Sequence, residues 1–147
     1  MKALFHWKKH AGCGQKYCWQ GVMEMTDIQK KKFERLEGFK SLKEGWDGFY
    51  ACTVDKNIIN FLQKVILAMT DDDLLKWNIF PTLDGGVMLS RRFSKNGQLY
   101  FSDDNTCTAC ALSDDVKDSM ELRFSITNNI SKVLDVINKI DNFFNIE

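Results

Sequence analysis

Apolar residues recur at helical spacing over the first half of the chain. From Asp27 to Lys43 they form one stripe among lysines and glutamates, which predicts an amphipathic helix capped by Thr26 or Asp27. A second helix should begin after Asp55 as N-cap and end near Met69. Its apolar residues cover more than half of its circumference, which predicts deep burial. Asp71–Asp73 should then form a solvated loop, because like charges repel and stay hydrated.

The pattern changes to strands between Leu75 and Ile126. Short apolar runs alternate there with turn residues such as Asp84-Gly85-Gly86 and Asn96-Gly97, which is typical of hairpins. Pro81 should place the first strand at a sheet edge, because proline donates no backbone hydrogen bond. The predicted strands are Trp77–Thr82, Val87–Phe93, Gln98–Ser102, Thr106–Leu112 and Met120–Ile126.

A last helix is predicted from a cap at Thr127 or Asn128 to about Phe144. The fold class is therefore α+β: two N-terminal helices, an antiparallel β-meander of four to five strands, and a C-terminal helix packed on the sheet. Residues 25–147 are expected to form this single domain. Residues 1–24 show no clean period and are interpreted as an N-terminal appendage, either flexible or the product of an upstream start codon.

Composition narrows the function classes. The 147 residues suit one domain, and 20 basic residues against 20 acidic ones give no net charge, so a nucleic-acid partner is not expected. The apolar runs in the sequence are shorter than a membrane-spanning helix requires. An odd number of cysteines, 5, without disulfide-framework spacing favours the reducing cytoplasm. Abundant Phe, Ile, Lys and Asn suit an AT-rich bacterial or phage genome.

Two patterns that contain cysteines raise the question of whether the chain binds a metal ion. His6, His10, Cys13 and Cys18 supply zinc ligand types at a spacing that fits no standard finger, so zinc binding stands beside an inert tail. Cys107 and Cys110 form a C-x-x-C pattern within a predicted strand, where residues three apart point to opposite faces. Buried or half-buried strand cysteines are a simpler interpretation than a redox or metal function, and no cofactor is predicted.

The sharpest local feature is the glycine-rich segment between the first two helices. Gly45 and Gly48 permit backbone turns, Trp46 can anchor the loop in the core, and Asp47 can bond local amides, which favours a loop that locks two helices. Alternatively, Trp46, Asp47 and Tyr50 form an exposed aromatic and acidic recognition loop.

No nucleophilic triad, P-loop or dinucleotide motif is present. An enzyme or small-ligand binder would instead need Asp47, Asp84 and Arg91 or Arg92 to converge around the sheet edge. Without a convincing catalytic set, we lean towards a protein that is not an enzyme.

The segments Gly45–Ala51 and Pro81–Gly86 are the basis of a resemblance to other proteins. The chain resembles a loose set of small uncharacterised bacterial proteins that share a Gly-Trp-Asp-Gly-Tyr-Gly-Ala-like loop and a Pro-x-x-Asp-Gly-Gly turn. The likeness covers about residues 33–112, and it departs where the glycine after the tyrosine is missing and where Thr53 replaces a proline. It implies an α+β module of bacterial or mobile-element origin, with no known activity.

These observations together predict a non-enzymatic protein–protein interaction module, such as an antitoxin-like or mobile-element accessory protein. Its binding residues would be Trp46, Asp47, Tyr50, Asp84, Arg91 and Arg92, and its partner an unidentified protein. A homodimer through the edge strand Trp77–Thr82 is a further expectation, since unpaired edges invite pairing.

Overall fold

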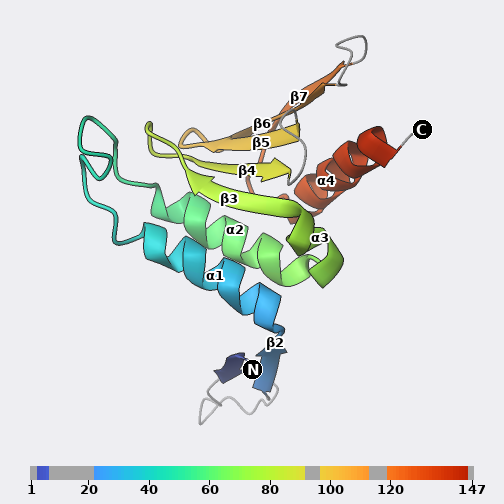
Figure 1. The fold of residues 1–147 in the computed structure, drawn as a ribbon, viewed down its shortest axis with the longest axis horizontal. Coiled ribbons are helices and arrows are strands. Elements are labelled where there is room, and N and C mark those ends of the chain that lie inside the picture. Colours follow the sequence, from blue (N-terminus) through green and yellow to red (C-terminus); the bar gives the residue numbers. More distant parts are fainter. Residues whose placement is uncertain (1–2, 7–21, 92–96, 113–118, 146–147) are drawn as a thin grey trace.

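The computed structural model describes residues 3–6, 22–91, 97–112 and 119–145. Figure 1 shows a sheet with helices packed against it. The strands are β1 Ala3–His6, β2 Val22–Met25, β3 Trp77–Pro81, β4 Val87–Arg91, β5 Gly97–Ser102, β6 Thr106–Leu112 and β7 Ser119–Ser125. The helices are α1 Asp27–Phe39, α2 Lys56–Ala68, α3 Asp71–Lys76 and α4 Ile130–Asn145.

The caps of the first two helices lie where the sequence predicts them. The Thr26 hydroxyl accepts from the backbone N–H of Gln29, whose side chain accepts from the Thr26 N–H, so the two form a capping box. Asp55 caps α2 by accepting from two backbone N–H groups. Helix α1 ends at Phe39, earlier than the predicted Lys43, and a turn follows.

The predicted loop at Asp71–Asp73 is wrong, because these residues form the first turn of α3. Thr70 caps this helix by accepting from the N–H of Asp73, and the Thr26 hydroxyl donates to the carboxylate of Asp71 over 2.7 Å. Carboxylates in a first turn are favoured by the positive end of the helix dipole. The same charges that suggested a loop therefore suit a helix start.

The strands β3 to β7 form one antiparallel sheet in chain order, which confirms the predicted meander and the α+β fold. Burial alternates along β5 and β6, so one face of the sheet lies in the core and the other is half-exposed. We call the second the open face; it carries Asn78, Ser90, Gln98, Tyr100, Thr108 and Arg123.

Helices α2 and α4 cover the core face. The rings of Phe61 on α2 and Phe101 on β5 lie 6.4 Å apart, and α4 contacts both α2 and β6, as the predicted packing of the last helix requires. One buried cluster runs from Leu36 to Ile140 and joins helices and sheet. Helix α4 begins at Ile130, one or two residues later than the predicted caps imply, and the Asn129 carbonyl accepts from Val133.

The outer edge of β3 is covered by α1. Lys32 donates to the carbonyl of Trp77 over 2.7 Å, and Arg35 donates to the carbonyl of Ile79 over 2.6 Å. The Arg35 guanidinium also lies over the rings of Phe39 and Phe80. Pro81 has no N–H to offer. The edge at which the sequence suggested self-association is thus occupied by side chains of the same chain.

Residues 3–6 and 22–25 pair as an antiparallel hairpin, with Ala3 opposite Met25. Figure 1 shows it beyond the N-terminal end of α1, away from the main sheet. The interpretation of residues 1–24 as an appendage stays a prediction. Among the residues that the structure describes, no helix has the length and apolar character to cross a membrane.

Candidate interaction site

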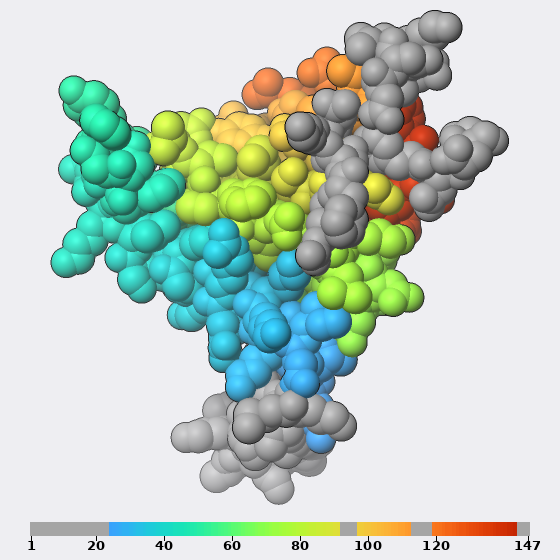
Figure 2. All heavy atoms as spheres, in the orientation of Figure 1, coloured from blue at the N-terminus to red at the C-terminus, as the bar shows by residue number. Residues whose placement is uncertain are grey.

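The segment between α1 and α2 closes on itself through backbone hydrogen bonds. The N–H of Gly45 donates to the carbonyl of Ala51 over 2.7 Å, and that of Gly48 donates to the carbonyl of Gly45 over 2.8 Å. Gly45 and Gly48 have φ angles of 80° and 89°, a region that other residues resist. The two glycines therefore make the sharp turns that project residues 48–50 outwards, at the left of Figure 1 and Figure 2.

Asp47 holds this loop together. One oxygen of its carboxylate accepts from the backbone N–H groups of Phe49 at 2.9 Å and Ala51 at 3.1 Å. The bond from Phe49, followed by that from Ala51, keeps the pKa of Asp47 below its ordinary value. Asp47 thus stays ionised and positions the backbone of the loop.

Trp46 is half-buried and lies outside the core cluster. Its indole N–H donates to the carbonyl of Cys52 over 3.0 Å, so the ring braces the base of the loop. Trp46 is thus a support within the loop, and it is not the core anchor that the sequence suggested.

Phe49 and Tyr50 stand in solvent at the tip. Their exposed fractions are 78% and 92%, and that of Leu83 in the turn between β3 and β4 is 58%. The two segments are joined, because Cys52 donates to the carbonyl of Leu83 over 2.7 Å and Asp55 donates to that of Gly85 over 2.9 Å. We call Phe49, Tyr50 and Leu83 the apolar tip. Of these three residues, only Tyr50 is among the binding residues predicted from the sequence.

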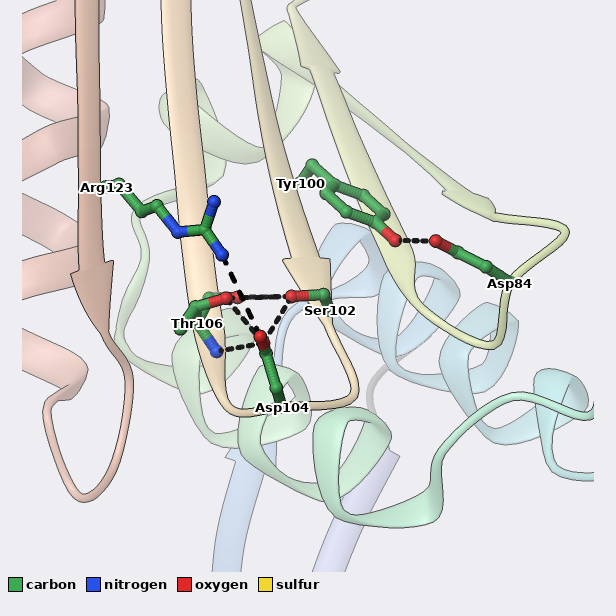
Figure 3. A network of polar contacts seen from close by, with 6 residues as sticks. All are labelled: Asp84, Tyr100, Ser102, Asp104, Thr106 and Arg123. Carbon is green, nitrogen blue, oxygen red and sulfur yellow. Dashed lines mark hydrogen bonds and ion pairs between the residues drawn. The ribbon is translucent and has the colours of Figure 1, made fainter.

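The turn between β3 and β4 is fixed around Asp84. Thr82 donates to this carboxylate over 2.6 Å, and the hydroxyl of Tyr100 on β5 donates to its other oxygen (Figure 3). The bonds from Thr82 and Tyr100 lower the pKa of Asp84. Burial and the neighbouring carboxylate raise the pKa of Tyr100 to about 12. At neutral pH the pair is therefore a fixed carboxylate and a neutral phenol.

Gly86 makes the close approach of this turn to the sheet possible. A Cβ atom there would lie 2.3 Å from the carbonyl oxygen of Phe101, a distance that no side chain tolerates. Asp84 is consequently held against the open face of the sheet by backbone contact as well as by Tyr100.

A second polar group lies in the turn between β5 and β6. Asp104 accepts from the hydroxyls of Ser102 and Thr106 over 2.6 and 2.5 Å, and these bonds lower its pKa (Figure 3). Arg123 on β7 lies 3.8 Å away, with both side chains mostly exposed. Exposed pairs of this kind contribute little stability, so this network chiefly shapes the turn.

Arg91 belongs to a different part of the molecule. It donates to Asp141 of α4 over 3.1 Å, and the two side chains are 13% and 8% exposed. Asp84 precedes β4 and its side chain meets the open face, whereas Arg91 ends β4 on the core side. The strand alone separates Val87 from Arg91 by roughly 13 Å. Asp84 and Arg91 therefore do not converge, and Arg92 lies outside the described residues.

The cysteines on β6 point to opposite faces, as their spacing predicts. Cys107 is fully buried, and this burial raises its thiol pKa to about 12. Burial, and next the charge of Glu121, raises the pKa of Cys110. Both stay protonated at neutral pH, which disfavours a thiolate reaction.

The described side chains include no group of three or more that could hold a metal ion. The candidate zinc ligands His6, His10, Cys13 and Cys18 lie outside that set of side chains.

The sequence matches no protein-family model, no curated protein and no solved structure. The resemblance to small bacterial proteins stays a prediction, and function must be argued from the residues themselves.

Proposed function

We propose that this protein is a non-enzymatic interaction module that binds another protein through the apolar tip. The observation that carries the proposal is the exposure of Phe49 and Tyr50 on a loop whose backbone is fixed by Asp47. Aromatic side chains are enriched among the residues that dominate binding energy. A loop already held in one conformation loses less entropy when it binds.

The surroundings of the tip suggest the chemistry of the partner. A shallow hollow adjoins it between the end of α1 and the start of α2. Three lysines and two acidic residues line this hollow: Lys40, Lys43, Lys56, Glu44 and Asp55. Lys40 is already paired with Glu37 over 3.2 Å, and Lys43 and Lys56 are balanced by Glu44 and Asp55. These surroundings therefore favour a partner segment that offers an apolar side chain and no strong charge, because complementary charges orient partners as they meet.

The alternative of an enzyme or small-ligand binder gains less support. Asp47 accepts from the backbone of its own loop, Asp84 accepts from Thr82 and Tyr100, and Arg91 is paired with Asp141. Groups that act on one substrate must lie within hydrogen-bond reach of it, or one water away. Among the described residues, Asp47, Asp84 and Arg91 do not form an arrangement of this kind around one substrate.

A quantitative pull-down from lysate of the source cells tests the proposal. The double variant Phe49→Ala, Tyr50→Ala removes the two aromatic side chains of the apolar tip and leaves Asp47 and Trp46 in place. Leu75→Ala removes another exposed apolar side chain, on α3, and is the matched control. We expect a stoichiometric partner that the wild type and the control capture and the double variant loses. Equal capture by all three proteins would refute a role for the tip.

The antitoxin-like role is a narrower form of this proposal. It requires that the captured protein inhibits growth when expressed alone. It also requires that co-expression of the wild type restores growth, while the Phe49→Ala, Tyr50→Ala variant does not. A captured protein that is harmless alone would leave the interaction module and remove the antitoxin-like role.

A further inference from the structure

The two edges of the sheet differ. Lys32 and Arg35 of α1 occupy the outer carbonyls of β3. At the opposite edge, β7 has β6 on one side and no neighbouring strand on the other among the described residues. An unpaired edge presents a row of N–H and C=O groups to any strand that fits. β7 is therefore the edge at which the sheet can be extended.

The backbone groups that β7 presents follow from one hydrogen bond. The N–H of Ile126 donates to the carbonyl of Asn105 over 2.9 Å, in the same register that pairs Thr106 with Ser125. Bonded and non-bonded residues alternate along an antiparallel strand. The even-numbered residues of β7 thus bond to β6, and Ser119, Glu121, Arg123 and Ser125 direct their N–H and C=O groups outwards.

We propose that two copies of this chain associate by antiparallel pairing of β7 with β7, with Leu122 on the two-fold axis. In this register Glu121 of each copy lies opposite Arg123 of the other, and Ser119 lies opposite Ser125. Each Glu121–Arg123 pair would be a bonded backbone pair, whose side chains lie about 5 Å apart at Cβ. The seven residues of the strand are all paired.

The charges select this register. Outward-bonding residues must meet each other, so the two-fold axis must pass through a residue of β7. An axis at Met120 or Phe124 pairs only three residues of each strand, which leaves Glu121, Leu122 and Arg123. An axis at Glu121 places two carboxylates opposite each other, and an axis at Arg123 places two guanidinium groups opposite each other. Like charges directly opposite are destabilising. Only the axis at Leu122 pairs opposite charges twice.

The other face of β7 is also complementary to itself. Met120, Leu122 and Phe124 are half-buried there, packed against the rim of the core, while α4 lies against β6. The same register sets Leu122 opposite Leu122, and Met120 opposite Phe124. A second copy would bury these six side chains together, with a favourable contact between sulfur and ring. Apolar burial then adds to the backbone bonds.

Sedimentation equilibrium of the full chain at rising concentration tests the dimer. We expect the mass to rise from 17.0 kDa towards twice that value. Glu121→Arg and Arg123→Glu are substitutions at exposed positions, and each should weaken the dimer by at least about tenfold, because both charge pairs become repulsive. An equimolar mixture of the two variants should restore it, since opposite charges then face each other across the heterodimer.

Matched controls make the result specific. Lys64→Glu on α2 and Glu34→Arg on α1 change the charge by the same amounts at other exposed positions and should leave the dimer intact. A wild type that stays monomeric up to about 1 mM overturns the proposal. So does a dimer whose affinity the single variants do not change, or a mixture that fails to restore it.

A cross-link fixes the register. In a background with Cys13, Cys18 and Cys52 replaced by serine, Leu122→Cys should form a disulfide between copies on oxidation, because facing residues at the axis lie closest. Ser119→Cys should not, since its equivalent lies about 20 Å away at the far end of the paired strands. Cross-linking at Ser119 instead of Leu122 would refute this pairing, whatever the mass of the dimer.

Discussion

Tyr100 is the residue whose ionisation should report on the fold. Burial and the carboxylate of Asp84 raise its pKa from 10.0 to about 12, so the folded state favours the neutral phenol more than the unfolded state does. The stability gained in this way is complete below pH 10 and is lost as the pH rises towards 12.

We therefore expect the free energy of unfolding of the wild type to fall between pH 10 and about 12. Tyr100→Phe should show a shallower fall over that range and should also lose the ultraviolet signal of a tyrosine that ionises near pH 12. Denaturant titrations at several pH values measure the first effect, and absorbance titration measures the second. An unchanged absorbance curve near pH 12 would contradict the assignment.

At single positions, the sequence indicates which residue types are unusual but not what they touch. The glycines around Asp47 predicted a tight loop, and the structure adds that Asp47 itself closes it. The bond between Asp84 and Tyr100 joins residues 16 positions apart. It depends on the register of three strands, which no local pattern contains. The exposure of Phe49 could not be predicted, because a phenylalanine is usually buried.

Among the elements, α1 has side chains with a role that its sequence pattern does not predict. Its apolar stripe predicted a helix packed by one face, and Leu36 and Phe39 confirm this. Lys32, which the pattern assigned to the outer face with other lysines and glutamates, instead bonds to a carbonyl of β3, as does Arg35. Hydrophobic periodicity identifies the buried face of a helix, but a long basic side chain at its border can reach backbone some way off.

Removing both basic side chains tests this attachment. Lys32→Ala with Arg35→Ala should lower the free energy of unfolding by about 2 kcal/mol, since charged donors to partly buried carbonyls contribute more than neutral ones. Lys31→Ala, at an exposed position of the same helix, should change it by less than about 0.5 kcal/mol. Urea denaturation measures both. Equal effects would mean that packing alone attaches α1 to β3.

At the scale of the whole molecule, the large buried cluster of the described residues lies outside the N-terminal hairpin, although Met25 at the end of β2 is itself buried. The buried cluster begins at Leu36 and ends at Ile140. A chain that starts at Val22 keeps β2, the capping box of α1 and every residue of that cluster. We expect its melting temperature to stay within about 4 °C of the full chain, a shift equivalent to about 1 kcal/mol. A much larger fall in thermal unfolding would show that residues 1–21 belong to the folded unit.

The overall architecture was the most predictable level. Alternating strands with turn residues between them specify a meander, because neighbouring strands in sequence then pair directly. The order from β3 to β7 confirms this. Which edge is covered could not be predicted, because it depends on where α1 lies in space.

The attachment of α1 to β3 also limits how large an assembly this sheet can build. A sheet that accepts strands at both ends can add copies without end and grow into a fibre. Here one end is closed by the chain's own lysine and arginine. Two copies joined at β7 would each turn a closed end outwards, and growth would stop there. The basic side chains of α1 would thereby prevent further copies from adding at β3, and the extended sheet would contain two copies of the chain.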